Sequence, residues 1–294
     1  MHKNLIKINL KGILTMKKIL ALALAAIMCF SMVALSSCGG YSGYDMESDT
    51  LVMATNAEFP PYEYKEGEAF KGIDIEIAQE IAKRMGKKLE IKDVKFDAAL
   101  LGVAEGKYDM VLAGLTVTED RKKSMSFSES YAKGVQVMIV AEGSTITSID
   151  DVFNYDENGD PVSLKDPSIK VGVQLNTTGD IYSSSDVTGW GFNDINEDGS
   201  TKTDRVVRLD NGALAVAALK NGQVDVVIID EEPAKSYVEA NEGIKILDSK
   251  YAEEDYAIAV HKKSTELLSE LNKVLAAMKE DGTLAAIVGK YIKE

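Results

Sequence analysis

A guanidinium group and a carboxylate follow two separate buried strands of this chain. Arg121 comes after an apolar strand that ends at Gly114, in a turn that also contains Thr116 and Thr118. A guanidinium beside hydroxyls and free backbone N–H groups suits a carboxylate, because it can donate two parallel hydrogen bonds. From this turn alone, a surface arginine is the simpler interpretation. Arg121 is therefore one candidate among others for binding an anion.

Asp230 is the corresponding carboxylate, at the end of a second apolar strand. A carboxylate in that position needs an ammonium partner or a helix N-terminus, because burying an unpaired charge is costly. Binding of a cationic group and N-capping of the helix that begins at Glu231 are equally good interpretations of the local sequence.

Hydroxyls and aromatic rings lie at other strand exits. The segment VGVQLNTTGDIY predicts a strand, a turn with Thr177 and Thr178, and a helix start whose free N–H groups suit an anion. An ordinary helix cap is the alternative. Phe59 and Phe96 lie at loop positions, although most such phenylalanines pack in a core.

Alternating strands and helices must position these residues. Apolar runs predict strands at 51–55, 89–94, 108–114, 135–141, 170–173, 206–209, 224–229, 244–247 and 256–260. Helical spacing and stop glycines predict helices at 73–85, 98–105, 213–221 and 231–240, another from Thr178, and two at the C-terminus. Strands separated by single helices indicate α/β sheets with helices on their faces.

A weak internal repeat favours two such sheets. The segments LLGVAEGKYDMVLAG and VAALKNGQVDVVIID superpose Gly106 on Gly222 and Asp109 on Asp225. The ends of the two strands are then equivalent, and ligands of open α/β sheets bind outside the carboxyl ends of strands. Two such ends would face each other across a cleft. Because helix-glycine-strand units are common, the repeat alone leaves a single lobe equally open.

Charge is distributed unevenly along the 294 residues. The chain has 33 basic and 47 acidic residues, a net charge of −14, with 45% hydrophobic and 27% charged content. This composition excludes disorder and collagen, and its acidity argues against a nucleic-acid partner. Residues 1–37 contain five lysines and no acid, so the rest of the chain has a net charge of −19.

The N-terminal segment is typical of an export signal. From Met16 the chain reads MKKILALALAAIMCFSMVALSSC, with two lysines, an apolar run and small residues before Cys38. Its end resembles the lipobox of bacterial lipoproteins, in which the cysteine is lipidated. We expect a signal peptide at 1–37 with Met16 as the true start, a lipidated flexible tether at 38–49, and a location outside the cytoplasmic membrane. A transmembrane anchor is the alternative.

The order of several segments resembles the polar amino-acid substrate-binding proteins of bacterial ABC importers, the family 3 extracellular solute-binding lipoproteins. These segments are ATNAEFPPYEY, FKGIDIEIAQEIAKRMG, FDAALLGVAEGKYDMVLAGLTVTEDRKKSMSFSESY, VGVQLNTTGDIY and LKNGQVDVVIIDEEPA. The resemblance implies an α/β fold of the type II periplasmic-binding-protein kind, in which two parallel or mixed sheets with flanking helices are joined by two hinge strands. Lobe 1 would be 50–138 plus 256–294, and lobe 2 would be 142–255.

The resemblance also implies which residues bind the two charged groups of an amino acid. Arg121 would clamp the α-carboxylate, helped by Thr116 and Thr178. Asp230 would bind the α-ammonium group together with the carbonyl of Gly114.

The ligand side chain would be held by a second set of residues. Phe59 and Phe96 match two aromatics that sandwich it, and Asn56, Glu58 and Gln174 match positions that line its pocket. The polar lining fits a cationic or polar amino acid such as arginine or lysine, and glutamine or cystine fits equally.

Two places depart from the family pattern. Ala113 and Gly114 stand where several members have serines, and Asn176 stands where glycine is usual. The first removes polar contacts, and the second affects the backbone geometry of the turn.

The implied activity is binding without chemistry. The ligand stabilises a closed form that a permease subunit accepts, no cofactor is needed, and we expect a monomer. The alternative on the same fold is an enzyme, a dehydratase of prephenate-like or arogenate-like acids with Glu58 as the general acid. A regulatory module of a larger sensor or cell-wall enzyme is a further alternative that the end of the chain at Glu294 disfavours.

Metal sites are not expected. Asp194, Asn196 and Asp198 match the opening of a calcium-binding loop, but position twelve is Arg205 in place of the closing acid. A similar acidic turn lies at 155–160, and we interpret both as solvated loops. His261 has no second histidine near it in the mature chain, which argues against a transition metal.

Overall fold

The computed structural model describes residues 41–293. The chain divides into a unit up to Ser42 and a compact unit from Gly43 onward, and the fold described below is that of the second unit. The predicted signal peptide, Met16 and Cys38 lie outside the described residues. Among the helices that are described, none combines the length and apolar character that a membrane span requires.

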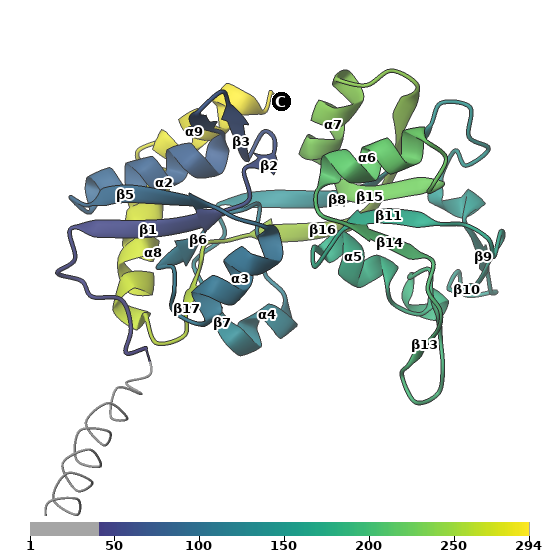
Figure 1. Cartoon of the computed structure of the whole chain (residues 1–294), viewed down its shortest axis with the longest axis horizontal. Helices are drawn as coiled ribbons and strands as arrows, with labels where there is room; N and C mark the ends of the chain where they lie inside the picture. The colour runs from purple at the N-terminus through teal and green to yellow at the C-terminus, as the bar shows by residue number, and fades with distance from the viewer. Residues whose placement is uncertain (1–40, 294) are drawn as a thin grey trace, which may run out of the picture. The chain divides into compact units, whose positions relative to one another are not determined.

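The first of two five-stranded sheets has the strand order β5-β1-β6-β17-β7. Its strands are β1 (Thr50–Thr55), β5 (Lys88–Asp93), β6 (Met110–Val111), β7 (Met125–Phe127) and β17 (Ala259–His261). β1 runs parallel to β5 and β6, whereas β17 is antiparallel to β6 and β7. The helices on this side are α2 (Ile73–Arg84), α3 (Phe96–Ala104), α4 (Glu119–Ser124), α8 (Thr265–Glu280) and α9 (Thr283–Tyr291) (Figure 1).

The second sheet has the order β14-β11-β15-β8-β16. Its strands are β8 (Ala132–Ala141), β11 (Val171–Gln174), β14 (Val206–Leu209), β15 (Val226–Asp230) and β16 (Ile244–Tyr256). β11 is parallel to β14 and β15, and β8 is antiparallel to β15 and β16. Its helices are α5 (Thr178–Ser183), α6 (Gly212–Lys220) and α7 (Glu231–Glu239).

Short strands complete the fold outside the two large sheets. One small sheet contains β2 (Glu58–Phe59), β3 (Glu63–Glu66) and β4 (Ala69–Lys71). Two hairpins are formed by β9 (Phe153–Tyr155) with β10 (Pro161–Leu164), and by β12 (Asp194–Ile195) with β13 (Thr201–Thr203). The acidic turns of the sequence lie in these two hairpins, and 3-10 turns occur at Ile149–Asp151 and Val187–Gly189.

Two long strands connect the sheets. β8 and β16 run beside each other between the two sheets in Figure 1, and Ala132 pairs with Tyr256 at their shared end. Just beyond, the N–H of Ala257 donates to the carbonyl of Leu115 in the first sheet's loop, at 3.1 Å. We predict two strands, at 244–247 and 256–260, and the second corresponds to β17. β16 extends beyond the first prediction to Tyr256, with register shifts near Lys250. Its polar residues conceal the strand pattern in the sequence.

The two copies of the internal repeat fold in the same way. The glycines that end α3 and α6 have φ values of 76° and 68°. Asp109 Oδ2 accepts a hydrogen bond from the N–H of Val52 at 2.7 Å, and Asp225 Oδ2 accepts one from the N–H of Lys170 at 2.8 Å. Each aspartate therefore ties its own strand to the start of the neighbouring strand. The carboxyl ends of β6 and β15 consequently lead to equivalent places in the two sheets.

The described end of the predicted tether contacts the folded unit. The N–H of Tyr44 donates to Ser264 Oγ at 3.2 Å, and its hydroxyl donates to the carbonyl of Thr50 at 2.9 Å. Lys87 Nζ donates to the carbonyls of Met46 and Ser48, at 2.7 and 2.6 Å. Residues 44–48 of the predicted tether are therefore held by hydrogen bonds to the folded unit.

Candidate functional site

A cavity lies where the loops of the two sheets meet, and the space between its atoms is about 310 Å³ when the part open to solvent is included. It is lined by Asn56, Phe59, Glu63, Phe96, Ala113, Gly114, Thr116, Arg121, Gln174, Thr177, Thr178 and Asp230. The structure thus brings together all the residues predicted for the site except Glu58. It adds Glu63, which we did not predict, and Ala113, which we named only as a departure from the family pattern.

Arg121 is buried in the first turn of α4, so the interpretation as a surface arginine is wrong. Thr118 caps this helix and accepts a hydrogen bond from the N–H of Arg121 at 3.2 Å. The guanidinium donates to the carbonyl of Thr116 at 2.8 Å and to that of Asn176 at 2.9 Å, which joins loops of the two sheets. A guanidinium has five N–H donors, so three remain for another acceptor.

The guanidinium of Arg121 stays protonated at neutral pH although it is buried. Burial lowers the pKa of Arg121 to about 10, while the negative charges of Glu254 and Asp230 act in the opposite direction. The group is therefore protonated at neutral pH. Its carbon Cζ lies 5.5 Å from the centroid of the Phe96 ring. Arg121 therefore lies over the Phe96 ring, which adds a cation–π contact.

Asp230 is also buried, and it does not act as a helix cap. It stands at the N-cap position of α7, but its side chain accepts no capping hydrogen bond. Instead Oδ1 accepts a hydrogen bond from the hydroxyl of Tyr256. Burial and the charge of Glu254 raise the pKa of Asp230 to about 7, and hydrogen bonds from Tyr256 and Gln136 oppose this shift. The carboxylate has donors in the structure, but within residues 41–293 no cation is paired with it.

Glu254 forms a polar connection behind the cavity wall. Its Oε2 accepts hydrogen bonds from Thr116 Oγ1 at 2.9 Å and from Gln136 Nε2 at 3.1 Å. Gln136 Nε2 also donates to Thr178 Oγ1, at 3.3 Å. The hydroxyl proton of Thr116 is therefore used by Glu254, and this hydroxyl can offer only its lone pairs to anything in the cavity.

Two amides meet across the cavity. Gln174 Nε2 donates to Asn56 Oδ1 at 2.9 Å, and both side chains are buried. Thr177 caps α5 by accepting from the N–H of Asp180, at 3.4 Å, and its hydroxyl donates to the carbonyl of Gln174 at 2.8 Å. The cap interpretation of Thr177 is therefore correct, although the residue also lines the cavity.

Glu58 lies outside the cavity, which corrects its predicted place in the side-chain pocket. Successive residues of a strand point to opposite faces, and in β2 Phe59 is buried while Glu58 is exposed. Glu58 Oε2 accepts a hydrogen bond from Asn211 Nδ2 at 3.1 Å, and its carbonyl accepts one from the Tyr237 hydroxyl at 2.9 Å. Both donors belong to the side of the second sheet.

Several buried polar groups around the cavity were not predicted from the sequence. Gln136 interrupts an otherwise apolar run in β8, and this is a signal that could have been used. Glu63 follows a tyrosine within ATNAEFPPYEY, Asp74 stands between two isoleucines at the start of a predicted helix, and Glu254 lies in a polar stretch of the sequence. Their burial depends on contacts distant along the chain, so local pattern does not reveal it.

The acidic hairpins have partners within the protein. Asp194 Oδ2 pairs with Arg205 at 3.0 Å, and Asp198 Oδ1 accepts hydrogen bonds from Ser200. Arg205 is the residue that occupies the place of the closing acid of a calcium loop. Within residues 41–293 no cluster of three or more His, Cys, Asp or Glu side chains is arranged to hold a metal ion.

Comparison with known proteins gives a consistent result. Residues 51–294 match the family of bacterial extracellular solute-binding proteins, family 3. The Arginine-binding extracellular protein ArtP of Bacillus subtilis (strain 168) is 32% identical over 280 residues, which cover 94% of this chain and 98% of that protein.

Solved structures agree with this relationship. An ancestral arginine-binding protein bound to arginine is 35% identical with a TM-score of 0.70, over 83% of this chain and 98% of that one. An ancestral arginine-binding protein bound to glutamine has a TM-score of 0.70 at 35% identity, over 84% and 99% of the two chains. These relatives confirm the expected two-lobed fold.

The enzyme alternative has weaker support. An ancestral amino acid-binding protein, described as a precursor of cyclohexadienyl dehydratase, is 27% identical with a TM-score of 0.68, over 83% of this chain and 96% of that one. It too is described as a binding protein, which agrees with our expectation that this chain is not an enzyme.

The chain belongs to the bacterial extracellular solute-binding proteins of family 3.

Proposed function

We propose that this protein binds a free amino acid outside the cytoplasmic membrane and delivers it to the permease of an ABC importer. The observation that carries the proposal is the presence of Arg121 and Asp230 in one cavity, both buried and oppositely charged. An amino acid has a carboxylate and an ammonium group on the same carbon atom. Arg121 has three N–H donors left for the carboxylate, and Asp230 offers the ammonium group a buried carboxylate.

Binding and closure are coupled in this proposal. Arg121 follows a strand of the first sheet, whereas Asp230 ends a strand of the second. A ligand reaches both groups only when the two sheets approach each other, so it stabilises the closed form by its greater affinity for that form. β8 and β16 are the strands about which the lobes would move, and a closed, loaded protein is what the permease would accept.

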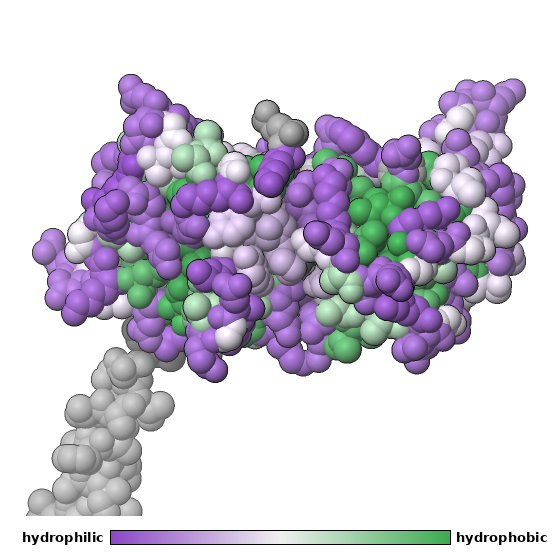
Figure 2. Space-filling model, turned by 90° about the horizontal axis from the view of Figure 1, so that it is seen from above, coloured by the Kyte–Doolittle hydropathy of each residue, from purple (hydrophilic) through white to green (hydrophobic). Residues whose placement is uncertain are grey.

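A cationic or polar side chain fits the ligand best. Asn56 and Gln174 supply buried amides to the cavity lining, and Phe59 and Phe96 supply aromatic rings. Figure 2 shows hydrophilic residues over most of one face of the molecule. Relatives named for arginine, and ancestral proteins solved with arginine and with glutamine, support this class.

The proposal includes membrane attachment. Signal cleavage before Cys38 and lipidation of that cysteine would hold the protein at the outer side of the cytoplasmic membrane as a monomer. Lobes at 50–138 plus 256–294 and at 142–255 would form the binding unit. The mass of the mature protein tests this attachment. A mass without lipid on Cys38 would contradict the membrane anchor but would not affect the proposal for the binding site.

A thermal-shift screen tests the binding function. The twenty amino acids, ornithine and cystine are added one at a time to the protein, and we expect at least one to raise the melting temperature. The variants Arg121→Ala and Asp230→Asn should lose this response, while Lys122→Ala, a change at the neighbouring surface position, should keep it. A full response in either site variant would show that the site is assigned wrongly. Conversion of prephenate or arogenate by the protein would favour the dehydratase instead.

A further inference from the structure

Two buried carboxyl groups beside the cavity have no part in the proposed ligand contacts. Glu63 in β3 has an exposed fraction of 1%, and Asp74 in the first turn of α2 has an exposed fraction of 0%. Within the described chain, Glu63 Oε2 and Asp74 Oδ1 lack any conventional hydrogen-bond donor. The N–H of Asp74 donates to the carbonyl of Tyr62, the residue before Glu63, at 2.9 Å, and a hydrogen bond between the two carboxyl groups contributes to the pKa of each. Since an ionised carboxylate only accepts hydrogen bonds, one of the two must carry a proton.

The surroundings determine which group carries it. Asp74 Oδ2 accepts hydrogen bonds from the N–H of Gly114 and from the hydroxyl of Tyr131, both at 2.8 Å. These two donors favour an ionised Asp74, whereas within the described residues Glu63 has none. Burial, together with the charge of Asp74, keeps the pKa of Glu63 well above its usual range. Glu63 is therefore the proton carrier and donates to Asp74.

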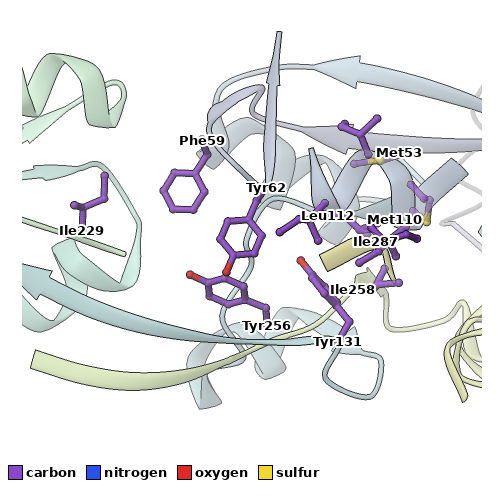
Figure 3. Packing of buried hydrophobic residues seen from close by; sticks show 14 of the residues in the cluster. Met53, Phe59, Tyr62, Met110, Leu112, Tyr131, Ile229, Tyr256, Ile258 and Ile287 are labelled. Carbon is purple, nitrogen blue, oxygen red and sulfur yellow. The ribbon is translucent and has the colours of Figure 1, made fainter. Parts of the chain in front are cut away.

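Among the other titratable groups nearby, the tyrosines are neutral and Asp230 acts on Glu63. Tyr62, Tyr131 and Tyr256 gather beside Phe59 in Figure 3, and burial raises the pKa of each of these tyrosines, which keeps them neutral. Asp230 lies across the cavity, and its negative charge also favours a protonated Glu63. The charge of Glu232 acts on Tyr62.

The proton on Glu63 supports one wall of the cavity. Gly114 lines the cavity with a φ of +51°, and a Cβ atom at this residue would lie 2.8 Å from Phe59 Cε1. Its N–H is held by Asp74, while within residues 41–293 no hydrogen bond is donated to its carbonyl. The N–H of Gly114 is therefore fixed by a hydrogen bond, and its carbonyl is available to accept one from a ligand.

We propose that Glu63 is a positioning residue that acts as a neutral hydrogen-bond donor: it orients Asp74, and Asp74 holds the Gly114 turn so that its carbonyl can accept from a bound ammonium group. This inference rests on the proposed function. The simplest role for an acid in a cavity is to attract a cationic ligand with its negative charge. The proposed role of Glu63 is the opposite, because the group is neutral and donates a hydrogen bond.

The variant Glu63→Gln separates the two roles. An amide of the same shape still donates to Asp74, so we expect the dissociation constant of the best ligand to stay within about twofold of the wild-type value. An ionised Glu63 facing the ammonium group would instead make this variant bind at least about tenfold more weakly. Glu63→Ala removes the donor and should weaken binding by about tenfold or more. Unchanged binding in Glu63→Ala would overturn the positioning role.

Infrared spectroscopy provides a test that does not depend on ligand affinity. At pH 8, where Asp230 is ionised, the wild-type spectrum minus that of Glu63→Gln should contain the C=O band of a protonated carboxyl group. A difference spectrum with only carboxylate bands would overturn the inference. If no amino acid stabilises the wild type, the proposed function fails, but this measurement still decides the state of Glu63. If the wild type binds and Glu63→Gln does not, the inference alone fails.

Discussion

Arg121 and Asp230 are both buried, but their charges are stabilised to different degrees. Arg121 donates to two carbonyls and lies over the Phe96 ring, and its pKa of about 10 leaves it fully charged at neutral pH. Asp230 has a tyrosine hydroxyl and an amide as side-chain donors, but burial and the charge of Glu254 raise its pKa to about 7, so its ionised form is less favoured than that of an ordinary aspartate. The anion-binding half of the site is thus preformed, whereas the cation-binding half is completed by its ligand.

This difference predicts proton release on binding. A protein with Asp230 protonated must lose that proton before the carboxylate can pair with an ammonium group, so the folded-state pKa of about 7 sets the range. Affinity should be constant above this pH and fall by up to about tenfold per pH unit below it. Calorimetry at pH 7 in buffers of different ionisation enthalpy measures the released protons directly. In the wild type the release should disappear at about pH 8.5, where Asp230 is already ionised, and equal release at that pH would refute the assignment.

Individual site residues differ in how far sequence could reveal them. Arg121 and Asp230 follow apolar strands whose ends coincide in the internal repeat, and this pattern alone makes them candidates for one shared site. Glu58 and Glu63 lie in one short segment with similar chemistry, yet only Glu63 lines the cavity. Strand alternation in β2 and the burial of β3 against α2 decide between them, and both depend on tertiary contacts.

At the scale of elements, most helices and buried strands were predictable, and two of the departures occur next to the cavity. We predict a strand at 108–114, but β6 contains only Met110–Val111. The chain leaves the sheet early because Gly114 adopts a positive φ and its N–H bonds to Asp74 instead of to a strand. α4 was not predicted, since it has six residues and no apolar periodicity.

Asn176 stands in the turn between β11 and α5, where glycine is usual in the family. Asn176 has a φ of 63°, a left-handed conformation that asparagine tolerates better than most residues, and its N–H donates to Asp180 Oδ2 at 2.9 Å. Asn176→Gly should leave the free energy of unfolding nearly unchanged, whereas Asn176→Ala should lower it by about 1 kcal/mol. Urea unfolding of both variants measures this difference. Equal stability of the two would mean that the backbone conformation is not the constraint.

Direct contacts between the two sides of the cleft predict an effect on closure. The Tyr237 hydroxyl donates to the carbonyl of Glu58 at 2.9 Å, and Lys95 pairs with Asp210 at 2.8 Å. Both contacts lie outside the cavity lining and would stabilise the closed form with or without ligand. Tyr237→Phe should therefore increase the radius of gyration of the ligand-free protein in X-ray scattering.

The same variant should bind its ligand a few-fold more weakly, because closure loses one hydrogen bond of about 1 kcal/mol. Tyr291→Phe is the matched control, since its hydroxyl bonds to Glu76 on the same side of the cleft. We expect this control to change neither quantity. An effect of equal size in both variants would show that the loss of a tyrosine hydroxyl, and not the contact across the cleft, is responsible.

At the scale of the whole molecule, the repeat and the order of segments were sufficient for two sheets and a cleft between strand ends. They could not predict how the two sides contact each other. The Asn56–Gln174 bond and the Lys95–Asp210 ion pair join residues more than a hundred positions apart, and no local pattern links them. Such contacts follow from the geometry of the connecting strands β8 and β16.

The acidity of the molecule predicts how salt affects ligand capture. Without residues 1–37 the chain has a net charge of −19, which attracts cations over roughly one Debye length. The association rate of arginine should therefore fall several-fold between about 10 mM and 500 mM salt, whereas that of neutral glutamine should stay constant. Dissociation rates should change little for either, because the buried contacts of Arg121 and Asp230 are screened less. Stopped-flow fluorescence measures these rates, and equal salt dependence of the two association rates would show that surface charge has no part in selecting the ligand.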